Sequence, residues 1–204
     1  YKLCGIFNNL NSFLKHMQKI TEEVYEIGGK QGLSSNVYLV KKEILIDLGS
    51  KENYLELIQN LKQLNIKPEQ IKTVIFTHLH YDHIGKLSEF KNAKFYASKE
   101  EIEDFQKFGY LSILNHEAFA QMQGLKINPI EETEFEIIHT PGHTRGSICL
   151  KYKDILFSGD TLFKKNIIGR TDLPTSKPEL MKSSLNKLKN YKILCPGHGK
   201  CIMK

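Results

Sequence analysis

The sequence predicts an α/β protein with two β-rich halves, and three observations support this prediction. Short apolar runs typical of buried strands come in two batches, one within residues 24–97 and one within residues 135–195. Each batch is followed or closed by a stretch with apolar residues at helical spacing, at 100–108 and at 178–190. With 204 residues, 40% of them hydrophobic and 25% charged, the chain is long enough for one sizeable core.

The expected elements follow in order from these patterns. Strands are expected in the first half at 24–27, 37–40, 44–48, 73–76 and 94–97. Helices are expected there at 54–64, 81–90 and 100–108, followed by an irregular or helical stretch at 110–129 that covers a pocket. The second half is expected to contain strands at 135–138, 148–152, 155–158 and 193–195 and a helix at 178–190.

Residues 1–16 are expected to be an extension of a single domain that runs from 17 to 204. Their apolar residues are spaced as on a helix, which would dock on the domain or on a partner. The alternative is that Met17 is the native start and that the extension is not native. A targeting peptide is not expected, because the extension has neither a continuous apolar core nor an arginine.

Charge indicates a solvated basic surface rather than a nucleic-acid interface. The net charge of +6 comes almost entirely from lysine, and no Arg-rich or aromatic-interleaved stretch accompanies it. Arg145 and Arg170 are the two arginines, and both fall in loops that carry motifs described below. Because the planar guanidinium suits paired carboxylate oxygens, we expect a carboxylate partner for each, from the substrate or from an Asp of the chain.

The four cysteines favour a reducing compartment. They show no metal-binding spacing, and Cys149 and Cys195 lie in apolar runs where buried thiols are common. Cys4 and Cys201 fit no pattern and are expected to be incidental. We therefore expect a cytoplasmic protein with no membrane partner, and the sequence leaves the oligomeric state open.

The densest chemical signal is the stretch Thr-His-Leu-His-Tyr-Asp-His-Ile-Gly at 77–85, directly after an apolar strand-like run. Alternation along an extended chain places His78, His80 and Asp82 on one side, and a turn there would bring His83 toward a second centre. Imidazole nitrogen and carboxylate oxygen suit zinc, iron and manganese, and four such groups fit two adjacent ions better than one. The alternative is a polar surface turn, which is improbable when only eight histidines are spread over the chain.

Three later loops each present one side chain of ligand type after an apolar run. They place His143 after Pro141-Gly142, Asp160 at the end of 155–160 and His198 after Pro196-Gly197. A dinuclear centre needs about six protein ligands, so further ligands are required beyond 78–83. Taken singly, each of these side chains is more often a core histidine or a turn or cap aspartate, and it is the repeated arrangement that favours ligands.

These residues resemble the metallo-β-lactamase superfamily over about residues 24–198, because every metal-binding motif is present in the expected order. The family pattern His-x-His-x-Asp-His matches 78–83 in full. The resemblance implies a four-layer αββα sandwich, which two batches of strands closed by helices fit. It implies a first metal on His78, His80 and His143, a second on Asp82, His83 and His198, and Asp160 bridging both together with a hydroxide. Asp47, at the end of 44–47, is similar to the family aspartate that braces the site, an ordinary turn Asp being the alternative.

The ligands predict hydrolysis by a metal-dependent enzyme. Two cations on one water lower its pKa toward neutrality, and one of them can polarise a substrate carbonyl. The expected nucleophile is therefore the bridging hydroxide, and no Gly-x-Ser-x-Gly elbow argues for a serine. Asp82 is the expected catalytic side chain, orienting the water or passing a proton to the leaving group. We expect two divalent ions, zinc first, with iron and manganese as alternatives.

Within the superfamily, 159–163 and 169–174 resemble the glyoxalase II-like branch, which hydrolyses thioesters such as hydroxyacyl-glutathione. Arg170 matches the basic position that touches the thiol carrier there, and pairing with Asp172 is the structural alternative. Six residues follow His198, so the helical domain that grips glutathione is not expected. The expected substrate is a small-molecule thioester, and the closer match is a compact single-domain thioesterase.

Other functions remain as alternatives. A persulfide dioxygenase would share the fold and use one iron on the residues matching His78, His143 and Asp160. A hydrolase of another ester or of a phosphodiester would use the same metals, although the 37 residues between Asp160 and His198 leave little room for a nucleic-acid recognition arm. A non-catalytic binding module would be expected to lack ligands, and a β-lactamase would be expected to carry a secretion signal.

Overall fold

The protein is described by a computed structural model that covers residues 17–29 and 34–203. The expectations for residues 1–16 and for Cys4 lie outside the described residues. None of the helices in the described part is long and apolar enough to span a membrane.

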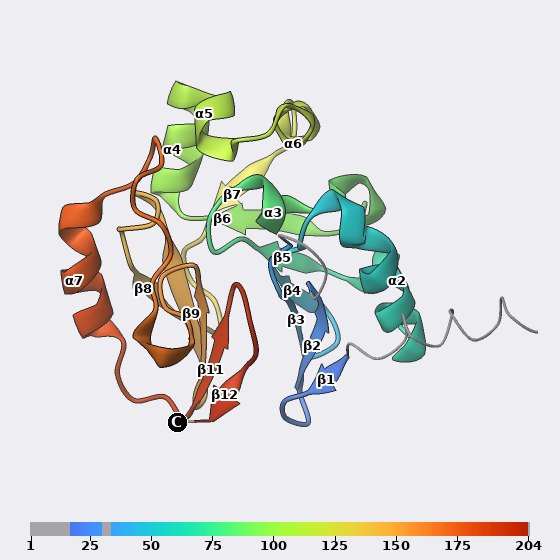
Figure 1. Ribbon diagram of the computed structural model, residues 1–204. Coiled ribbons are helices and arrows are strands. Elements are labelled where there is room, and N and C mark those ends of the chain that lie inside the picture. The colour runs from blue at the N-terminus through green and yellow to red at the C-terminus, as the bar shows by residue number, and fades with distance from the viewer. Residues whose placement is uncertain (1–16, 30–33, 204) are drawn as a thin grey trace, which may run out of the picture.

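The described strands form two sheets that face each other (Figure 1). The first sheet runs in sequence order through β1 (Gln18–Lys19), β2 (Val24–Gly28), β3 (Val37–Val40), β4 (Ile44–Ile46), β5 (Thr73–Ile75), β6 (Lys94–Ala97) and β7 (Ile127–Pro129). The second sheet has the order β12 (Ile202–Met203), β11 (Ile193–Pro196), β10 (Ile155–Gly159), β9 (Ile148–Tyr152) and β8 (Glu136–His139). Each half of the sequence therefore builds one sheet, and the final strand β12 extends the second sheet at one edge.

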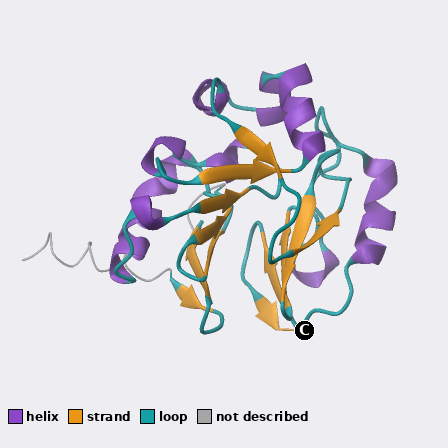
Figure 2. Cartoon of the chain, turned by 180° about the vertical axis from the view of Figure 1, so that it is seen from behind, coloured by secondary structure: helices purple, strands orange, loops and turns teal. Residues whose placement is uncertain are grey.

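Helices cover the outer faces of both sheets, as the view from behind also shows (Figure 2). Those on the side of the first sheet are α2 (Tyr54–Gln63), α3 (Tyr81–Ile84), α4 (Lys99–Phe108), α5 (Tyr110–Ile113) and α6 (His116–Met122). The second sheet is covered by α7 (Pro178–Lys187). The short 3-10 helices are η1 (Lys51–Asn53), η2 (Pro68–Gln70), η3 (Leu87–Glu89) and η4 (Lys164–Asn166).

Three apolar cores separate these four layers. One lies between the first sheet and its helices, a second between the two sheets, and a third between the second sheet and α7. Alternation along the strands distributes side chains among them: Leu156 points into the outer core, whereas Ile155 and Phe157 point between the sheets. Because both faces are covered, β9 and β10 are apolar at nearly every position rather than alternating. The four-layer αββα sandwich expected from the sequence is confirmed.

Two elements differ from the expectations. The helix expected at 81–90 is only one turn long, because Gly85 adopts a φ of 62° and a Cβ there would lie 2.6 Å from the Cβ of Leu48. The chain then resumes as η3. The stretch 110–129 is helical over much of its length, which was one of the two expected conformations, but it ends in the edge strand β7. This strand was not expected because its sequence, Ile-Asn-Pro, lacks the alternation of apolar residues that is typical of a strand.

Candidate metal centre

All the predicted ligands lie at one edge of the sandwich, where strands of both sheets end. In the first sheet β4 and β5 are parallel, and in the second β8, β10 and β11 share one direction because β9 is antiparallel to β8 and β10. Their carboxyl ends therefore lie at the same edge of each sheet. Asp47 follows β4, residues 78–83 follow β5, His143 follows β8, Asp160 follows β10 and His198 follows β11.

Three buried histidines form the first group. Nε2 of His143 lies 2.9 Å from Nδ1 of His80 and 3.2 Å from Nε2 of His78. Burial lowers the pKa of all three rings, well below the ordinary value for His78 and to about 3 for His80. The folded chain therefore holds them as neutral imidazoles whose lone pairs converge, which is the form that binds a metal ion.

A second group forms beside the first, from Asp82, His83 and His198. Asp82 and His83 lie on the single turn of α3, and Nε2 of His198 lies 3.2 Å from Oδ2 of Asp82. The ligand atoms of each group lie within 4.8 Å of one another, and a third set of the same kind, His78, His83 and Asp160, overlaps both groups. The two groups are therefore adjacent parts of one cluster.

Asp160 lies between the two groups. Its Oδ1 is 3.4 Å from Nε2 of His83, and its Oδ2 is 3.6 Å from Nε2 of both His143 and His198. Burial by itself would raise the pKa of Asp160, but His83, His198 and His143 outweigh it and lower the pKa. A charged carboxylate thus faces ring nitrogens of both groups.

Hydrogen bonds behind the rings fix which nitrogen faces the cluster. Nδ1 of His143 donates to the backbone carbonyl of Arg170 at 2.7 Å, so its Nε2 is left as an acceptor. Nδ1 of His78 lies 3.2 Å from Oγ1 of Thr77, again leaving Nε2 toward the centre. These contacts hold each ring in one orientation before any ion binds.

Asp47 supports the cluster from behind. Its Oδ2 accepts hydrogen bonds from Nδ1 of His83 and from Oγ1 of Thr77, both at 2.8 Å, and its Oδ1 accepts from the backbone N–H of Thr77, also at 2.8 Å. The residue adopts a φ of 55°, a region that costs free energy for a side chain other than glycine and occurs where surrounding contacts enforce it. The carboxylate joins the loop after β4 to the loop after β5 and orients His83.

The residues present fit a pair of metal ions. His83 Nε2 and Asp160 Oδ1 are buried and lie 3.4 Å apart, and neither atom makes a hydrogen bond among the described residues, although an unsatisfied buried polar atom is costly. Both atoms belong to the cluster of imidazole and carboxylate donors that borderline cations such as zinc and iron prefer. Coordination of a cation would satisfy them.

Helix α4 holds two of the ligand loops together. The carboxylate of Glu101 accepts from the backbone N–H of Leu79 at 2.8 Å and from Oγ1 of Thr144, so it contacts residues adjacent to ligands in both halves of the molecule. At the start of the same helix, Ser98 Oγ donates to the carbonyl of Gly146 at 2.6 Å. A Cβ on Gly146 would lie 2.4 Å from the backbone nitrogen of Glu101, so glycine is required for this approach.

The two arginines differ in their surroundings. Arg145 donates to Oδ1 of Asp104 and to Oε2 of Glu103, both at 2.9 Å, and so anchors the loop after His143 to α4. Asp104 and Glu103 thus provide the carboxylate partner that was expected for Arg145. Arg170 pairs with Asp172 at 2.9 Å, which was the structural alternative, yet both side chains are exposed and Arg170 also lines the cavity described below.

The turn that carries His198 is held by polar groups of the first sheet. Nδ2 of Asn36 donates to the carbonyls of Pro196 at 3.0 Å and Gly199 at 2.6 Å, on either side of the ligand. Tyr38 donates from its hydroxyl to the same Pro196 carbonyl at 2.7 Å. Both Asn36 and Tyr38 are buried, so His198 projects from a fixed turn.

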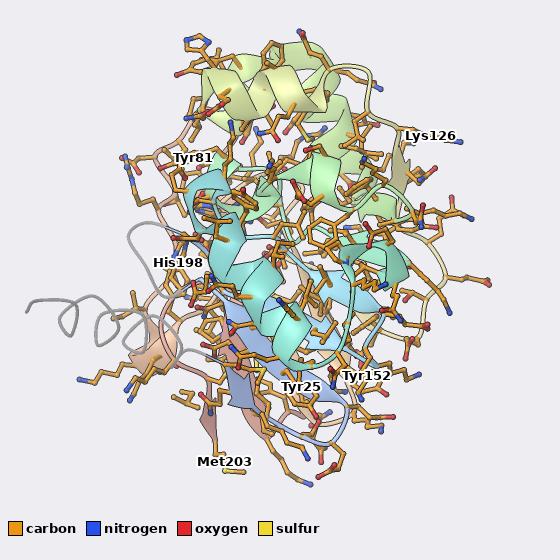
Figure 3. The ribbon with its side chains drawn as sticks, turned by 90° about the vertical axis from the view of Figure 1, so that its right-hand side faces the viewer. Tyr25, Tyr81, Lys126, Tyr152, His198 and Met203 are labelled. Carbon is orange, nitrogen blue, oxygen red and sulfur yellow. The ribbon has the colours of Figure 1, made fainter. Side chains whose placement is uncertain are left out.

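A cavity of about 410 Å³ opens onto the cluster, and five of the seven candidate ligands line it. The view of the molecule from the side shows His198 and Tyr81 along the same edge (Figure 3). Besides Gly169 and Arg170, the rest of the wall is formed by the largely apolar side chains of Tyr81, Leu114, Phe163, Ile168 and Leu173. Residues 110–129 were expected to cover a pocket. From this stretch, Leu114 is the one residue that lines the cavity.

Comparison with known proteins places this arrangement in a family. The family model described as the metallo-beta-lactamase superfamily matches residues 31–198. The chain belongs to the metallo-beta-lactamase superfamily. Together with the His and Asp groups, this assigns it to the metal-dependent hydrolases of that superfamily.

Two relatives and one solved structure illustrate the similarity. The chain is 35% identical over 192 residues to "Probable metallo-hydrolase MJ0888" of Methanocaldococcus jannaschii, covering 82% of this chain and 89% of that protein. It is 32% identical over 180 residues to the hydroxyacylglutathione hydrolase GloC of Haemophilus influenzae, covering 78% and 81%. Among solved structures, the di-iron-bound form of TTHA1623 superposes with a TM-score of 0.68 at 24% identity, covering 85% of this chain and 91% of that one.

The sequence did not identify every residue that supports this superfamily site. Glu101 lies in the pattern Ser-x-x-Glu, which explains it as part of a helix cap, and Ser98 does cap α4 through Glu101 N–H. The carboxylate of Glu101, however, accepts hydrogen bonds from the two ligand loops, and no local sequence pattern signals these contacts. Asn36 precedes a strand, and no local pattern signals its contacts with Pro196 and Gly199, which lie 160 and 163 positions later in the chain.

Proposed function

We propose that the chain is a thioester hydrolase that uses two divalent metal ions and acts on a small-molecule thioester. The first ion would be held by His78, His80 and His143, the second by Asp82, His83 and His198, with Asp160 contributing to both. Zinc is the metal we expect first, with iron and manganese as alternatives, because the donors are imidazole and carboxylate only.

The observation that carries the proposal is the presence of two adjacent ligand groups joined by Asp160 at the floor of one cavity. A mononuclear iron enzyme needs only one group, whereas here Asp82, His83 and His198 assemble into a second. Asp47 orients His83 within this second group, and a site for a single ion on the first group would not require that contact. The geometry therefore supports a binuclear hydrolase over a persulfide dioxygenase.

When bound, two divalent cations would lower the pKa of an attacking water and polarise a substrate carbonyl. The chain's own residues supply the rest. Asp82 lines the cavity and contacts Nε2 of His198, so its carboxylate is placed to orient the attacking water and to hold its proton. A thiolate leaves readily, so no strong general acid is required for this substrate class.

The cavity supports a substrate with an apolar portion. Leu114, Phe163, Ile168 and Leu173 exclude water from one side of the ligands, which strengthens electrostatic interactions there. Arg170 stands at the exposed rim, where its guanidinium can exchange Asp172 for an anionic group on the thiol carrier. The similarity to the hydroxyacylglutathione hydrolase GloC favours a thioester over another ester or a phosphodiester.

The test is a substrate panel with zinc-loaded protein. S-lactoylglutathione, a simple acyl thioester, a phosphodiester and a lactam would be compared for hydrolysis, together with oxygen uptake on a persulfide. We expect thioester hydrolysis that is lost in His80→Ala and Asp160→Asn. His139→Ala is the matched control, because His139 ends β8 just before the loop that carries His143 but is exposed and outside the cluster. Oxygen-dependent persulfide turnover without hydrolysis would overturn the proposal.

A further inference from the structure

The hairpin that carries His198 has two cysteines: Cys195 lies in β11, and Cys201 immediately precedes β12. The antiparallel pairing of β11 and β12 matches Ile193 with Met203 and Leu194 with Ile202. Continuing that register by one residue sets Cys195 directly opposite Cys201 and leaves His198 at the midpoint of the turn. Opposed residues on antiparallel strands have Cα atoms about 4.5–5.5 Å apart, which lies within the range that a disulfide spans.

The two sulfurs are already in contact. Sγ of Cys201 lies 2.9 Å from Sγ of Cys195, so a displacement of about 1 Å would bring them to bonding distance. Cys195 is fully buried between the sheets, whereas Cys201 is partly exposed. The contact of Cys201 with Cys195 was not expected from the sequence, because it depends on the pairing of β11 with the two-residue strand β12.

We propose that Cys195 and Cys201 form a reversible disulfide on exposure to a hydroperoxide, and that this modification tightens the turn that presents His198. The proposal does not depend on which substrate the enzyme hydrolyses. It concerns a covalent modification of the chain beside the second ligand group.

The chemistry proceeds in two balanced steps. The sulfur of Cys201, the accessible one, attacks the terminal oxygen of the hydroperoxide, the O–O bond breaks, and an alcohol or water leaves as Cys201 becomes a sulfenic acid. The sulfur of Cys195 then attacks that of Cys201, and water leaves with the proton of Cys195. Two thiols and one hydroperoxide thus give one disulfide, one alcohol or water, and one further water. Burial, together with the Cys201 thiol, raises the pKa of Cys195, which assigns the first attack to Cys201.

The bond would act on the metal centre through the turn. Cys195 immediately precedes Pro196, whose carbonyl receives hydrogen bonds from both Asn36 and Tyr38, and Sγ of Cys201 contacts the Tyr38 hydroxyl at 3.5 Å. A cross-link between the two strands closes a short ring around His198 and removes open conformations of the turn. The ion held by the second group should therefore leave more slowly from the oxidised chain.

The sequence makes the bond directly detectable. Trypsin cleaves after Lys192 and after Lys200, so Cys195 and Cys201 fall in separate peptides that remain joined only through a disulfide. Zinc-loaded protein would be treated with a slight excess of hydrogen peroxide, alkylated with iodoacetamide and digested without reductant. We expect the joined peptides at a mass two hydrogens below their sum, separating again after dithiothreitol.

Variants and a second measurement complete the test. Cys149→Ser should leave the joined peptides unchanged, and Cys201→Ser should abolish them. Transfer of zinc to a chromogenic chelator should show a slow phase at least about threefold slower after oxidation in the parent chain and no such change in Cys201→Ser. Stable sulfinic acid on Cys201 with Cys195 still alkylated would overturn the disulfide, and equal chelator rates would overturn its effect on His198.

Discussion

Replacing Glu101 with Gln tests how α4 supports the ligand loops. The substitution keeps the shape of the side chain and an oxygen that accepts from Leu79 N–H, but it removes the titrating group. Burial raises the pKa of Glu101 to about 7 from an ordinary 4.5, although hydrogen bonds from Thr144 and Leu79 act in the opposite direction. The parent chain and the variant should therefore differ in how their stability depends on pH.

The sign of that difference follows from proton binding. Between pH 4.5 and about 7 the folded chain keeps a proton on Glu101 that the unfolded chain has released, so the free energy of unfolding falls as pH rises. Over this interval the loss amounts to roughly 3 kcal/mol, and it is complete once Glu101 is ionised in both states. Glu101→Gln lacks this contribution, so the stability of the parent relative to the variant should fall by that amount from pH 4.5 to pH 8.

The assay is urea unfolding of both proteins at a series of pH values, followed by circular dichroism with a chelator present so that no bound ion contributes. The linear dependence on urea gives the free energy of unfolding at each pH. Glu103→Gln is the matched control on the same helix, because Arg145 lowers the pKa of Glu103 and moves its titration below this range. Parallel pH profiles for the parent chain and Glu101→Gln would refute the reasoning.

Three further predictions concern the support of the site and the core. Asp47→Ala removes the partner of His83 Nδ1 and should weaken binding of the second zinc ion about 10–100-fold by calorimetric titration; unchanged affinity would contradict the role given to that contact. Asn36→Ala removes the side-chain donor to the Gly199 carbonyl and leaves Tyr38 as the side-chain donor to the Pro196 carbonyl, and it should cost about 1–3 kcal/mol of unfolding free energy in urea; a cost below a few tenths of a kcal/mol would show that other contacts hold the turn. Leu150→Ala empties a fully buried position between the sheets and should cost about 2–5 kcal/mol in the same assay, and a near-neutral result would contradict tight packing there.

The candidate ligands could be selected from the sequence because each one has a local signal. His143 and His198 each follow a short apolar strand and a turn, Asp160 directly follows a strand, and parallel strands bring such ends to one edge. The sequence also indicates which side chains have the right chemistry for an ion. Because these signals are local, the candidate ligands can be selected without knowledge of the tertiary contacts.

The supporting contacts were not predictable for the opposite reason. Glu101 lies 22 residues from Leu79 and 43 from Thr144, and its pattern is already explained by a helix cap. Cys201 gains its partner only through a two-residue strand that is too short to leave an apolar pattern. Asn36 likewise acts across the interface between the two sheets. Each of these roles depends on the packing of the two halves against each other.

The most direct test of the central claim is a count of metal ions per chain. Protein loaded with zinc and freed of unbound metal would be measured by elemental analysis, beside His198→Ala, whose substituted side chain is about one-third exposed and belongs to the second group alone. We expect two ions in the parent chain and one in the variant. One ion in both proteins would contradict this expectation.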